Sequence, residues 1–161
     1  MKLTIIRIKP NPAGKDRPRY GAPTATQLAA EWVDWRNDTG STVSLTGVAL
    51  WHKAYSGSQW KWERITGFSG NVGVGEIVRV HSGQKRDGVI AANDLAGAHH
   101  HVFTGAYLYV WNNREGDTPL LHNDSKTETI DSGSYDPNPP EGAVLVRMGN
   151  KLAGQANAAG W

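Results

Sequence analysis

The sequence predicts an all-β protein built from short strands and turns. Glycine and proline are frequent, with 19 and 8 residues among 161, and both interrupt regular structure. Apolar residues alternate with polar ones over short runs instead of recurring at the helical period. Hydrophobic residues make up 39% of the chain and charged residues 20%, which supplies a core without the charge excess of a disordered chain. We therefore expect one folded domain with an appendage.

The first third of the chain contains three predicted strands. Residues 3–8 are rich in β-branched side chains and stop before a proline, and a short helix is expected at residues 26–30. In residues 31–37, alternation places Val33 and Trp35 on one face, and Asp34 and Arg36 on the other, where they are expected to form an ion pair. Residues 43–51 read as a strand that bends at Gly47.

The middle and the end of the chain are expected to contain further short strands and long connections. Residues 60–63 alternate as an exposed strand with both indoles on one side, and residues 75–81 form the next strand. Residues 82–104 read as a long connection with little internal structure. Strands follow at residues 127–130 and 143–148, and residues 149–161 are expected to carry little structure of their own.

Residues 106–121 form the stretch around which the rest of the chain is expected to pack. In residues 106–111 aromatic and aliphatic side chains alternate, which predicts a strand with Tyr107, Tyr109 and Trp111 on one face. Residues 112–117 form a polar turn containing asparagine, aspartate and glycine. A second strand follows, so that Trp111 and Leu120 anchor a hairpin.

Five segments in order carry a family likeness. They are residues 11–16 (NPAGKD), 31–37 (EWVDWRN), 43–47 (VSLTG), 75–83 (GEIVRVHSG) and 110–117 (VWNNREGD), the last followed by Leu120. With these segments the chain resembles the lamin-tail domain in its bacterial form. The resemblance implies an immunoglobulin-like antiparallel β-sandwich over residues 1–135, with long loops. Residues 136–161 are then a C-terminal strand and extension that is a candidate assembly arm.

The resemblance also implies a binding or attachment module instead of an enzyme. The chain departs from the family pattern at Val48, where an aromatic residue is usual, and at Trp51–His52, where an acidic residue usually follows the strand. It also lacks the glycine that is usual after Asp124. These departures bear more strongly on the surface that the family likeness implies than on the fold that it implies.

Composition excludes several classes of chemistry. The chain has no cysteine, so disulfides, thiolate zinc sites and cysteine nucleophiles are absent. No Gly-x-Ser-x-Gly motif or pair of converging carboxylates occurs, and we expect no enzymatic activity and no cofactor. The apolar run at residues 3–8 is too short for a signal peptide or a membrane span. A cytoplasmic location or a place in an assembly is therefore expected, unless a signal has been removed.

Two sets of residues could in principle bind metal ions. The triplet His99, His100 and His101 points alternately along an extended chain, so at most two of the imidazoles can face one ion, and a solvated loop is the favoured interpretation. Asp16, Asp117 and Asp124 lack the spacing of a calcium loop. Short acidic side chains in turns usually accept hydrogen bonds from nearby backbone amides, which is the role expected here.

Aromatic residues around a Gly–Ser turn form the strongest candidate surface. For these side chains, a role in an interface and a role in packing the sandwich are equally expected. Trp and Tyr side chains are enriched in protein interfaces, so a protein partner or self-assembly is expected, with a larger particle or surface as one candidate setting. A terminal indole on the tail is expected to dock on this domain or on a neighbour. The candidate interface residues are Trp51, Tyr55, Trp60, Trp62, His99, His100, His101 and Trp161.

Two other binding functions remain open from the sequence. Net charge is +2 with scattered bases, which argues against a dedicated nucleic-acid protein, although Arg79, Lys85, Arg86 and Arg114 could converge on a polyanion. Carbohydrate recognition through Trp51, Trp60 and Trp62 is the further alternative, because indoles stack on sugars.

Overall fold

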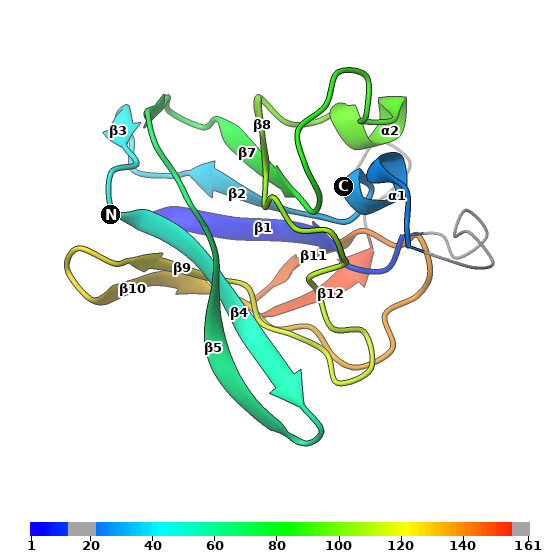
Figure 1. The fold of residues 1–161 in the computed structure, drawn as a ribbon. Coiled ribbons are helices and arrows are strands. Elements are labelled where there is room, and N and C mark those ends of the chain that lie inside the picture. The colour runs from blue at the N-terminus through cyan, green and yellow to red at the C-terminus, as the bar shows by residue number, and fades with distance from the viewer. Residues whose placement is uncertain (13–21, 156–161) are drawn as a thin grey trace.

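The computed structural model describes residues 1–12 and 22–155, and within these ranges strands predominate (Figure 1). The prediction of an all-β protein is therefore confirmed. The two helices are α1 (Ala25–Ala29) and α2 (Ala92–Leu95). In chain order the strands are β1 (Leu3–Lys9), β2 (Trp32–Asn37), β3 (Val43–Ser44), β4 (Val48–Ser56), β5 (Gln59–Gly67), β6 (Asn71–Val72), β7 (Ile77–His81), β8 (His100–Phe103), β9 (Leu120–Asn123), β10 (Glu128–Ser132), β11 (Leu145–Met148) and β12 (Lys151–Gln155).

The strands form two main sheets and one small one. The larger sheet has the order β12-β11-β1-β2-β7-β8, and the smaller main sheet has the order β10-β9-β4-β5. A two-stranded sheet pairs β3 with β6, and Gly47, with φ of +85°, turns the chain from β3 into β4. The predicted single strand over residues 43–51 is thus two strands in different sheets. The turn between them depends on glycine, because a side chain at Gly47 would meet the Ser125 hydroxyl and because positive φ favours glycine.

One core lies between the two main sheets. Val33 and Trp35 point into it from β2, as the alternation predicts, and both are fully buried. The smaller sheet contributes Leu50 and Leu121, which are opposite each other in the pairing of β4 with β9. The cluster also includes Leu3, Ile5, Ile8, Leu45, Val48, Val72, Val78, Val80, Trp111, Tyr135, Ala143, Leu145 and Leu152.

Residues 82–104 contain more structure than expected. They include α2 and then β8, which pairs with β7 in parallel. Every other named strand pair in the described residues is antiparallel. A parallel neighbour needs a crossover connection of about a dozen residues or more, and this is why a long segment lies between the two strands. The prediction of a loop with little structure was wrong for residues 100–103.

The prediction of a strand in the first half of the central hairpin was also wrong. Residues 106–111 form no strand, and Tyr107 and Leu108 are 77% and 65% exposed. The backbone amides of Val110 and Trp111 donate to the carboxylate of Glu31 instead of to a neighbouring strand. The second half is correct in part, because β9 begins at Leu120, and both anchors, Trp111 and Leu120, are buried.

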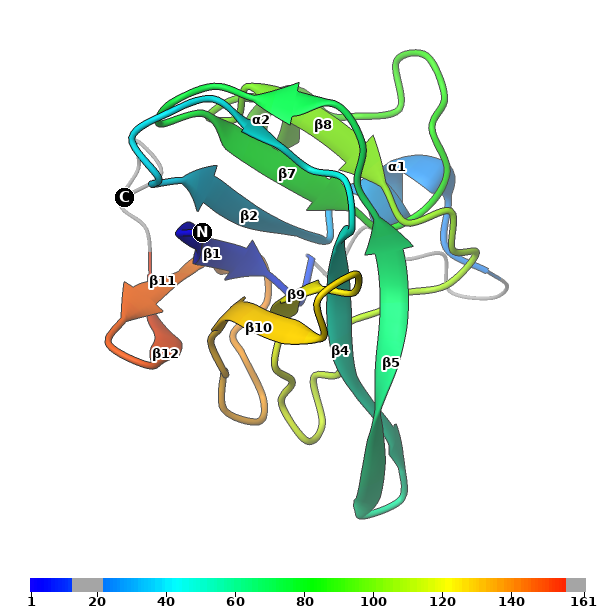
Figure 2. The same cartoon turned by 90° about the vertical axis from the view of Figure 1, so that its left-hand side faces the viewer.

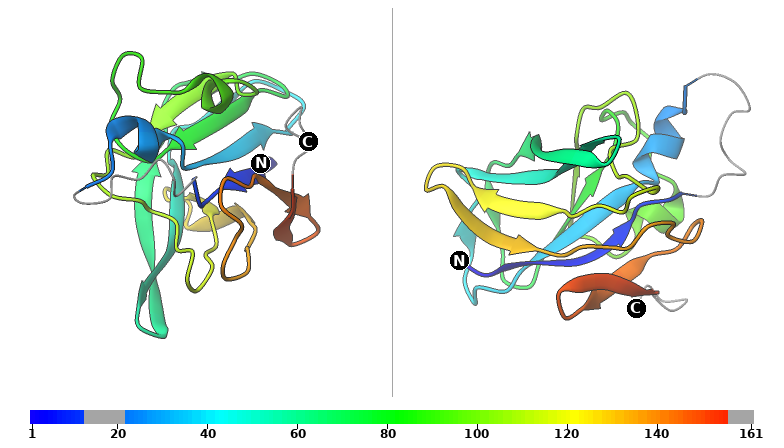
Figure 3. Two further views of the ribbon diagram at one scale, coloured as in Figure 1. Left: turned by 90° about the vertical axis from the view of Figure 1, so that its right-hand side faces the viewer. Right: turned by 90° about the horizontal axis from the view of Figure 1, so that it is seen from below.

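The C-terminal residues continue the larger sheet. Strand β12 pairs with β11, which pairs with β1, so both strands extend this sheet past β1 (Figure 3). Residues 151–155 were expected to have little structure, and that prediction was wrong. Leu152 explains the difference, because it is 1% exposed and belongs to the core. Trp161 lies outside the described residues.

A buried row of charges crosses the outer face of the larger sheet. Asp34 on β2 is fully buried between Arg7 on β1 and Arg79 on β7, which are its register neighbours. The carboxylate oxygens lie 2.5 Å from Arg7 Nε and 2.7 Å from Arg79 Nε. The expected pair of Asp34 with Arg36 was wrong, because Arg36 bonds Asp38. Neighbouring strands supply the two arginines, which sequence adjacency could not show.

The segment around α2 covers this charge row. Arg79 Nη1 donates to the carbonyls of Asp94 and Ala96, and Arg7 Nη2 donates to that of Gly97. The Asp94 carboxylate accepts bonds from the Trp32 indole and from Lys9. Charged groups that leave water need this degree of hydrogen bonding. The crossover is therefore fixed to the sheet by polar contacts.

We expect Asp34→Asn to destabilise the protein by about 3–5 kcal/mol, because the two buried guanidinium groups would lose their compensating charge. Urea unfolding measures the loss. Asp38→Asn is the matched control: it breaks an ion pair whose arginine side chain is 37% exposed, and we expect it to cost about 1 kcal/mol or less. Equal losses in the two variants would contradict the central role of Asp34.

Candidate interaction surface on a projecting hairpin

The β4–β5 hairpin projects from the body of the protein (Figure 2). Strand β9 pairs with β4 only over Val48–Trp51, whereas β5 follows β4 to Ser56 and Gln59. Beyond Trp51 the hairpin is therefore a two-stranded ribbon. It closes at Gly57–Ser58, where Gly57 has φ of +64°, as expected for a two-residue turn with glycine first.

One face of the hairpin carries a packed group of aromatic and basic side chains. Tyr55 lies opposite Trp60, and Lys53 lies opposite Trp62. The two indole centroids are 5.3 Å apart in an edge-to-face contact, and Lys53 Nζ lies 4.2 Å from the Trp60 centroid. Trp60 and Trp62 remain 45% and 39% exposed. We call Lys53, Tyr55, Trp60 and Trp62 the aromatic face.

Trp51 lies on the same side of β4 but is part of the body of the protein. Its indole N–H donates to Asp124 at 3.0 Å, and its ring packs edge to face on His122. Asp124 also accepts bonds from His122 and Arg64, and these partners outweigh burial and lower the pKa of Asp124. Asp124 thus bonds side chains where bonds to turn amides were expected.

The opposite face of the hairpin is anchored by a buried histidine. His52 Nδ1 lies 2.8 Å from Asp117, and Nε2 lies 3.2 Å from Glu63. Burial lowers the pKa of His52, but the two carboxylates outweigh burial and hold the pKa above its usual value. Asp117 also accepts from the amides of Lys53, Asn112 and Thr118, which includes the turn amides that the sequence predicted.

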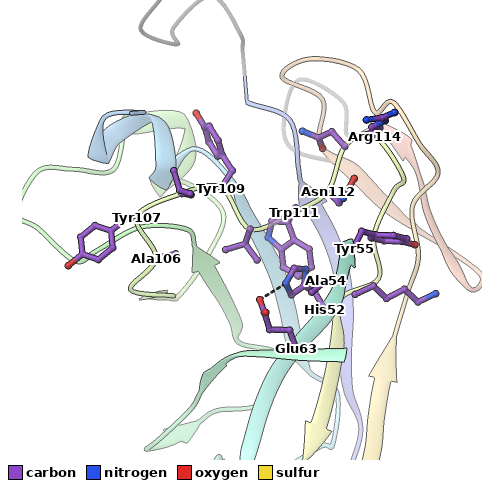
Figure 4. Close-up of a pocket in the computed structure, with 14 residues that line it drawn as sticks. His52, Ala54, Tyr55, Glu63, Ala106, Tyr107, Tyr109, Trp111, Asn112 and Arg114 are labelled. Carbon is purple, nitrogen blue, oxygen red and sulfur yellow. Dashed lines mark hydrogen bonds and ion pairs between the residues drawn. The ribbon is translucent and has the colours of Figure 1, made fainter. Parts of the chain in front are cut away.

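A groove with a volume of about 730 Å³ lies between the hairpin and residues 106–114 (Figure 4). His52, Tyr55 and Glu63 line it from the hairpin, and Trp111 and Arg114 line it from the other side. Both ring nitrogens of His52 are engaged by carboxylates. This arrangement fixes the orientation of the ring, and it leaves His52 without a free nitrogen to activate a nucleophile.

Glu31 holds the wall of this groove from beneath. It is fully buried, and its Oε1 accepts bonds from Ser82 Oγ at 2.5 Å, from Val110 N at 2.8 Å and from Trp111 N at 3.4 Å. Among the described residues, no group bonds the other oxygen, Oε2. Burial raises the pKa of Glu31 to about 8. A single glutamate at the start of a strand gave no sequence signal for this role.

The structure separates the three candidate histidines. His99 Nδ1 accepts from the amide of Ile77, His100 bonds Glu76, and His101 bonds His81. Burial lowers the pKa of His81 to about 4, so at neutral pH it donates from Nδ1 to Ala29 O and accepts from His101 at Nε2. In residues 1–12 and 22–155, no group of three or more metal-ligating side chains is arranged to hold an ion.

The proposed polyanion surface does not assemble as expected. Arg79 is 2% exposed and is bonded to Asp34, so it cannot contact a ligand. Lys85 and Arg86 are exposed on the loop after β7, and Arg114 lies on the rim of the groove. Asp16 and Trp161 are among the residues that the structure does not describe.

Comparison with protein-family models gives no match, and comparison with curated proteins gives no match either. Neither of the two described helices has the length and apolar character needed to cross a membrane.

We expect Glu31→Gln to change how stability depends on pH. The pKa of Glu31 is about 8 when folded against 4.5 for an ordinary glutamate. The contribution of Glu31 to the free energy of unfolding is therefore complete below pH 4.5 and is lost as pH rises to about 8. Glutamine does not titrate. The free energy of unfolding of the Glu31→Gln variant should therefore rise relative to that of the wild type by up to about 1.4 kcal/mol per pH unit over this window.

Urea unfolding at pH 5 and pH 8.5 would measure this gain. Glu128→Gln, at an exposed position on β10, provides the control and should run parallel to the wild type. A Glu31→Gln curve that also runs parallel would show that the carboxyl is ionised in the folded protein.

Proposed function

We propose that this chain is a non-enzymatic protein-interaction module, of the immunoglobulin-like lamin-tail type, that self-assembles or attaches to a larger particle. The observation that carries the proposal is the aromatic face on the projecting hairpin. Two indoles, each more than a third exposed, lie side by side on a ribbon that extends past the rest of its sheet.

The chemistry of the aromatic face suits protein contact. Trp and Tyr dominate the energetics of protein interfaces because they bury large apolar area while their polar atoms keep hydrogen bonds. The contact between Trp60 and Trp62, with Lys53 over the Trp60 ring, limits the side-chain freedom that binding would cost. His52 and Asp117 hold the root of the ribbon. A partner would thus meet a preorganised surface.

Two facing sheets around one core support the family part of the proposal. An immunoglobulin-like sandwich requires this arrangement, and the core includes Trp35 from the larger sheet and Leu50 from the smaller one. The parallel pairing of β7 with β8 is a local departure at an edge of the larger sheet.

Carbohydrate and nucleic-acid binding receive less support from the geometry. The planes of Trp60 and Trp62 are 80° apart, so the pair offers no continuous flat platform for successive sugar rings or bases. The burial of Arg79 removes one of the four bases expected to form a polyanion site.

The groove beside the hairpin has a structural role in this proposal. The absence of a free nitrogen on His52 supports that role.

We expect the full chain to self-associate, and Trp60→Ala/Trp62→Ala to weaken this association at least about tenfold, because interface indoles are frequent hot spots. Sedimentation velocity and native mass spectrometry over a concentration range would measure it. Tyr107→Ala removes an even more exposed aromatic side chain, from residues 106–114, and it should leave the association unchanged.

Two further measurements separate the alternative functions. A chain that stays monomeric, and whose indole fluorescence responds to added glycans through Trp60 and Trp62, would replace protein contact by carbohydrate recognition. Salt-dependent retention on DNA would instead favour the polyanion function.

A further inference from the structure

We propose that the partner is a second copy of this chain, joined edge to edge through β5. The two β5 strands run antiparallel about a twofold axis that passes next to Trp62. This inference rests on the proposed function and specifies its partner and register.

Strand β5 is the open edge of its sheet. Within residues 1–12 and 22–155 it pairs with β4 on one side only, and it is the last strand in the order β10-β9-β4-β5. Residues 59–64 are all exposed. Open edges present unpaired backbone N–H and C=O groups that can pair with another strand. A two-stranded ribbon is also marginally stable by itself, so further strands would stabilise the projecting part of the hairpin.

The register of the hairpin shows which backbone groups are free. Ser56 and Gln59 flank the two-residue turn, and the flanking residues of such a turn form a hydrogen-bonded pair. Because alternate residues direct their backbone groups to opposite sides, Trp60, Trp62 and Arg64 direct theirs away from β4. These three residues are available for pairing with a second strand.

Side chains along β5 are self-complementary about Trp62. Antiparallel pairing centred there places Lys61 opposite Glu63 of the other copy, and the symmetry repeats this pair. Trp60 then lies opposite Arg64 of the other copy, where a guanidinium can stack on an indole. Opposite charges in facing positions stabilise antiparallel pairs. When two copies of the sequence Trp-Lys-Trp-Glu-Arg at residues 60–64 run in opposite directions, the lysine of each copy thus faces the glutamate of the other.

Neighbouring registers lack this complementarity. An axis at residue 61 places Lys61 opposite Lys61 of the other copy, and an axis at residue 63 does the same with Glu63. An axis at residue 64 brings two Arg64 side chains together. Like charges in facing positions are destabilising. Edge charges commonly prevent uncontrolled pairing, and here their order favours one register.

The intramolecular contacts leave these groups able to pair. The Glu63 side chain is 56% exposed although Oε1 lies near His52, and a carboxylate can accept further bonds through its second oxygen. The Arg64 side chain is 50% exposed beside Asp124. Twofold pairing keeps both aromatic faces on the same side of the joined sheet, and it is a closed interface that does not propagate into fibres.

Charge reversal tests the register. We expect Lys61→Glu and Glu63→Lys each to weaken self-association at least about tenfold, because each places like charges opposite one another twice. The double variant Lys61→Glu/Glu63→Lys restores opposite charges and should recover to within about threefold of the wild type. It cannot restore the contact of His52 with Glu63, so recovery would be specific to the interface. A double variant as weak as the single ones overturns the register.

Cysteine cross-linking gives a second readout, and the chain has no cysteine of its own. In the proposed register, Lys61→Cys in one copy faces Glu63→Cys in the other as a pair with Cα atoms about 4.5 Å apart, within the range for a disulfide. A mixture of these two variants should form a covalent heterodimer under mild oxidation, whereas each variant alone should cross-link much less. Equal cross-linking in all three samples overturns the proposal.

The outcomes distinguish this inference from the proposed function. Association that depends on Trp60 and Trp62, with neither charge rescue nor selective cross-linking, overturns edge pairing and leaves the protein-interaction function in place. A chain that stays monomeric at every concentration and does not cross-link overturns the dimer. The proposed function is then decided separately by the glycan and DNA measurements.

Discussion

The larger sheet depends on the compensation of one buried carboxylate. Asp34 faces away from the hydrophobic core and has no contact with water, so it requires cations from both sides, and Arg7 and Arg79 supply them from the adjacent strands. A slip of one residue in β2 would move Asp34 into the core. The same arginines hold the α2 segment through its carbonyls, and this contact positions the crossover that leads to the parallel strand β8.

Asp117 has a comparable role at the root of the hairpin. It binds the imidazole of His52 and the amide of Lys53 on β4, and it also accepts from amides of its own turn. The projecting ribbon is therefore fixed at its base while its tip meets solvent. Since Trp60 and Trp62 contact each other and Lys53, the hairpin presents an exposed aromatic face of packed side chains, and its free edge is available for a partner.

Sequence patterns predicted most strands and parts of the candidate surface. The alternation around Trp35 identified a core strand, and the pattern around Trp60 and Trp62 identified an exposed strand with both indoles on one side. Residues 106–111 have an equally clear alternation but form no strand. The amides of Val110 and Trp111 bond a buried glutamate located about 80 residues earlier in the chain, and no local pattern reports such a long-range partner.

Local patterns in the sequence were enough to predict the all-β class, the position of β2 and the shared face of Val33 and Trp35, because side-chain period and turn residues act locally. The folded arrangement was needed to show which charges pair, how the histidine triplet is divided among separate partners, and that β5 is an open edge. The physical reason is that pairing partners and free edges depend on the order of strands in the sheets. That order is set by packing and by charge compensation between distant segments.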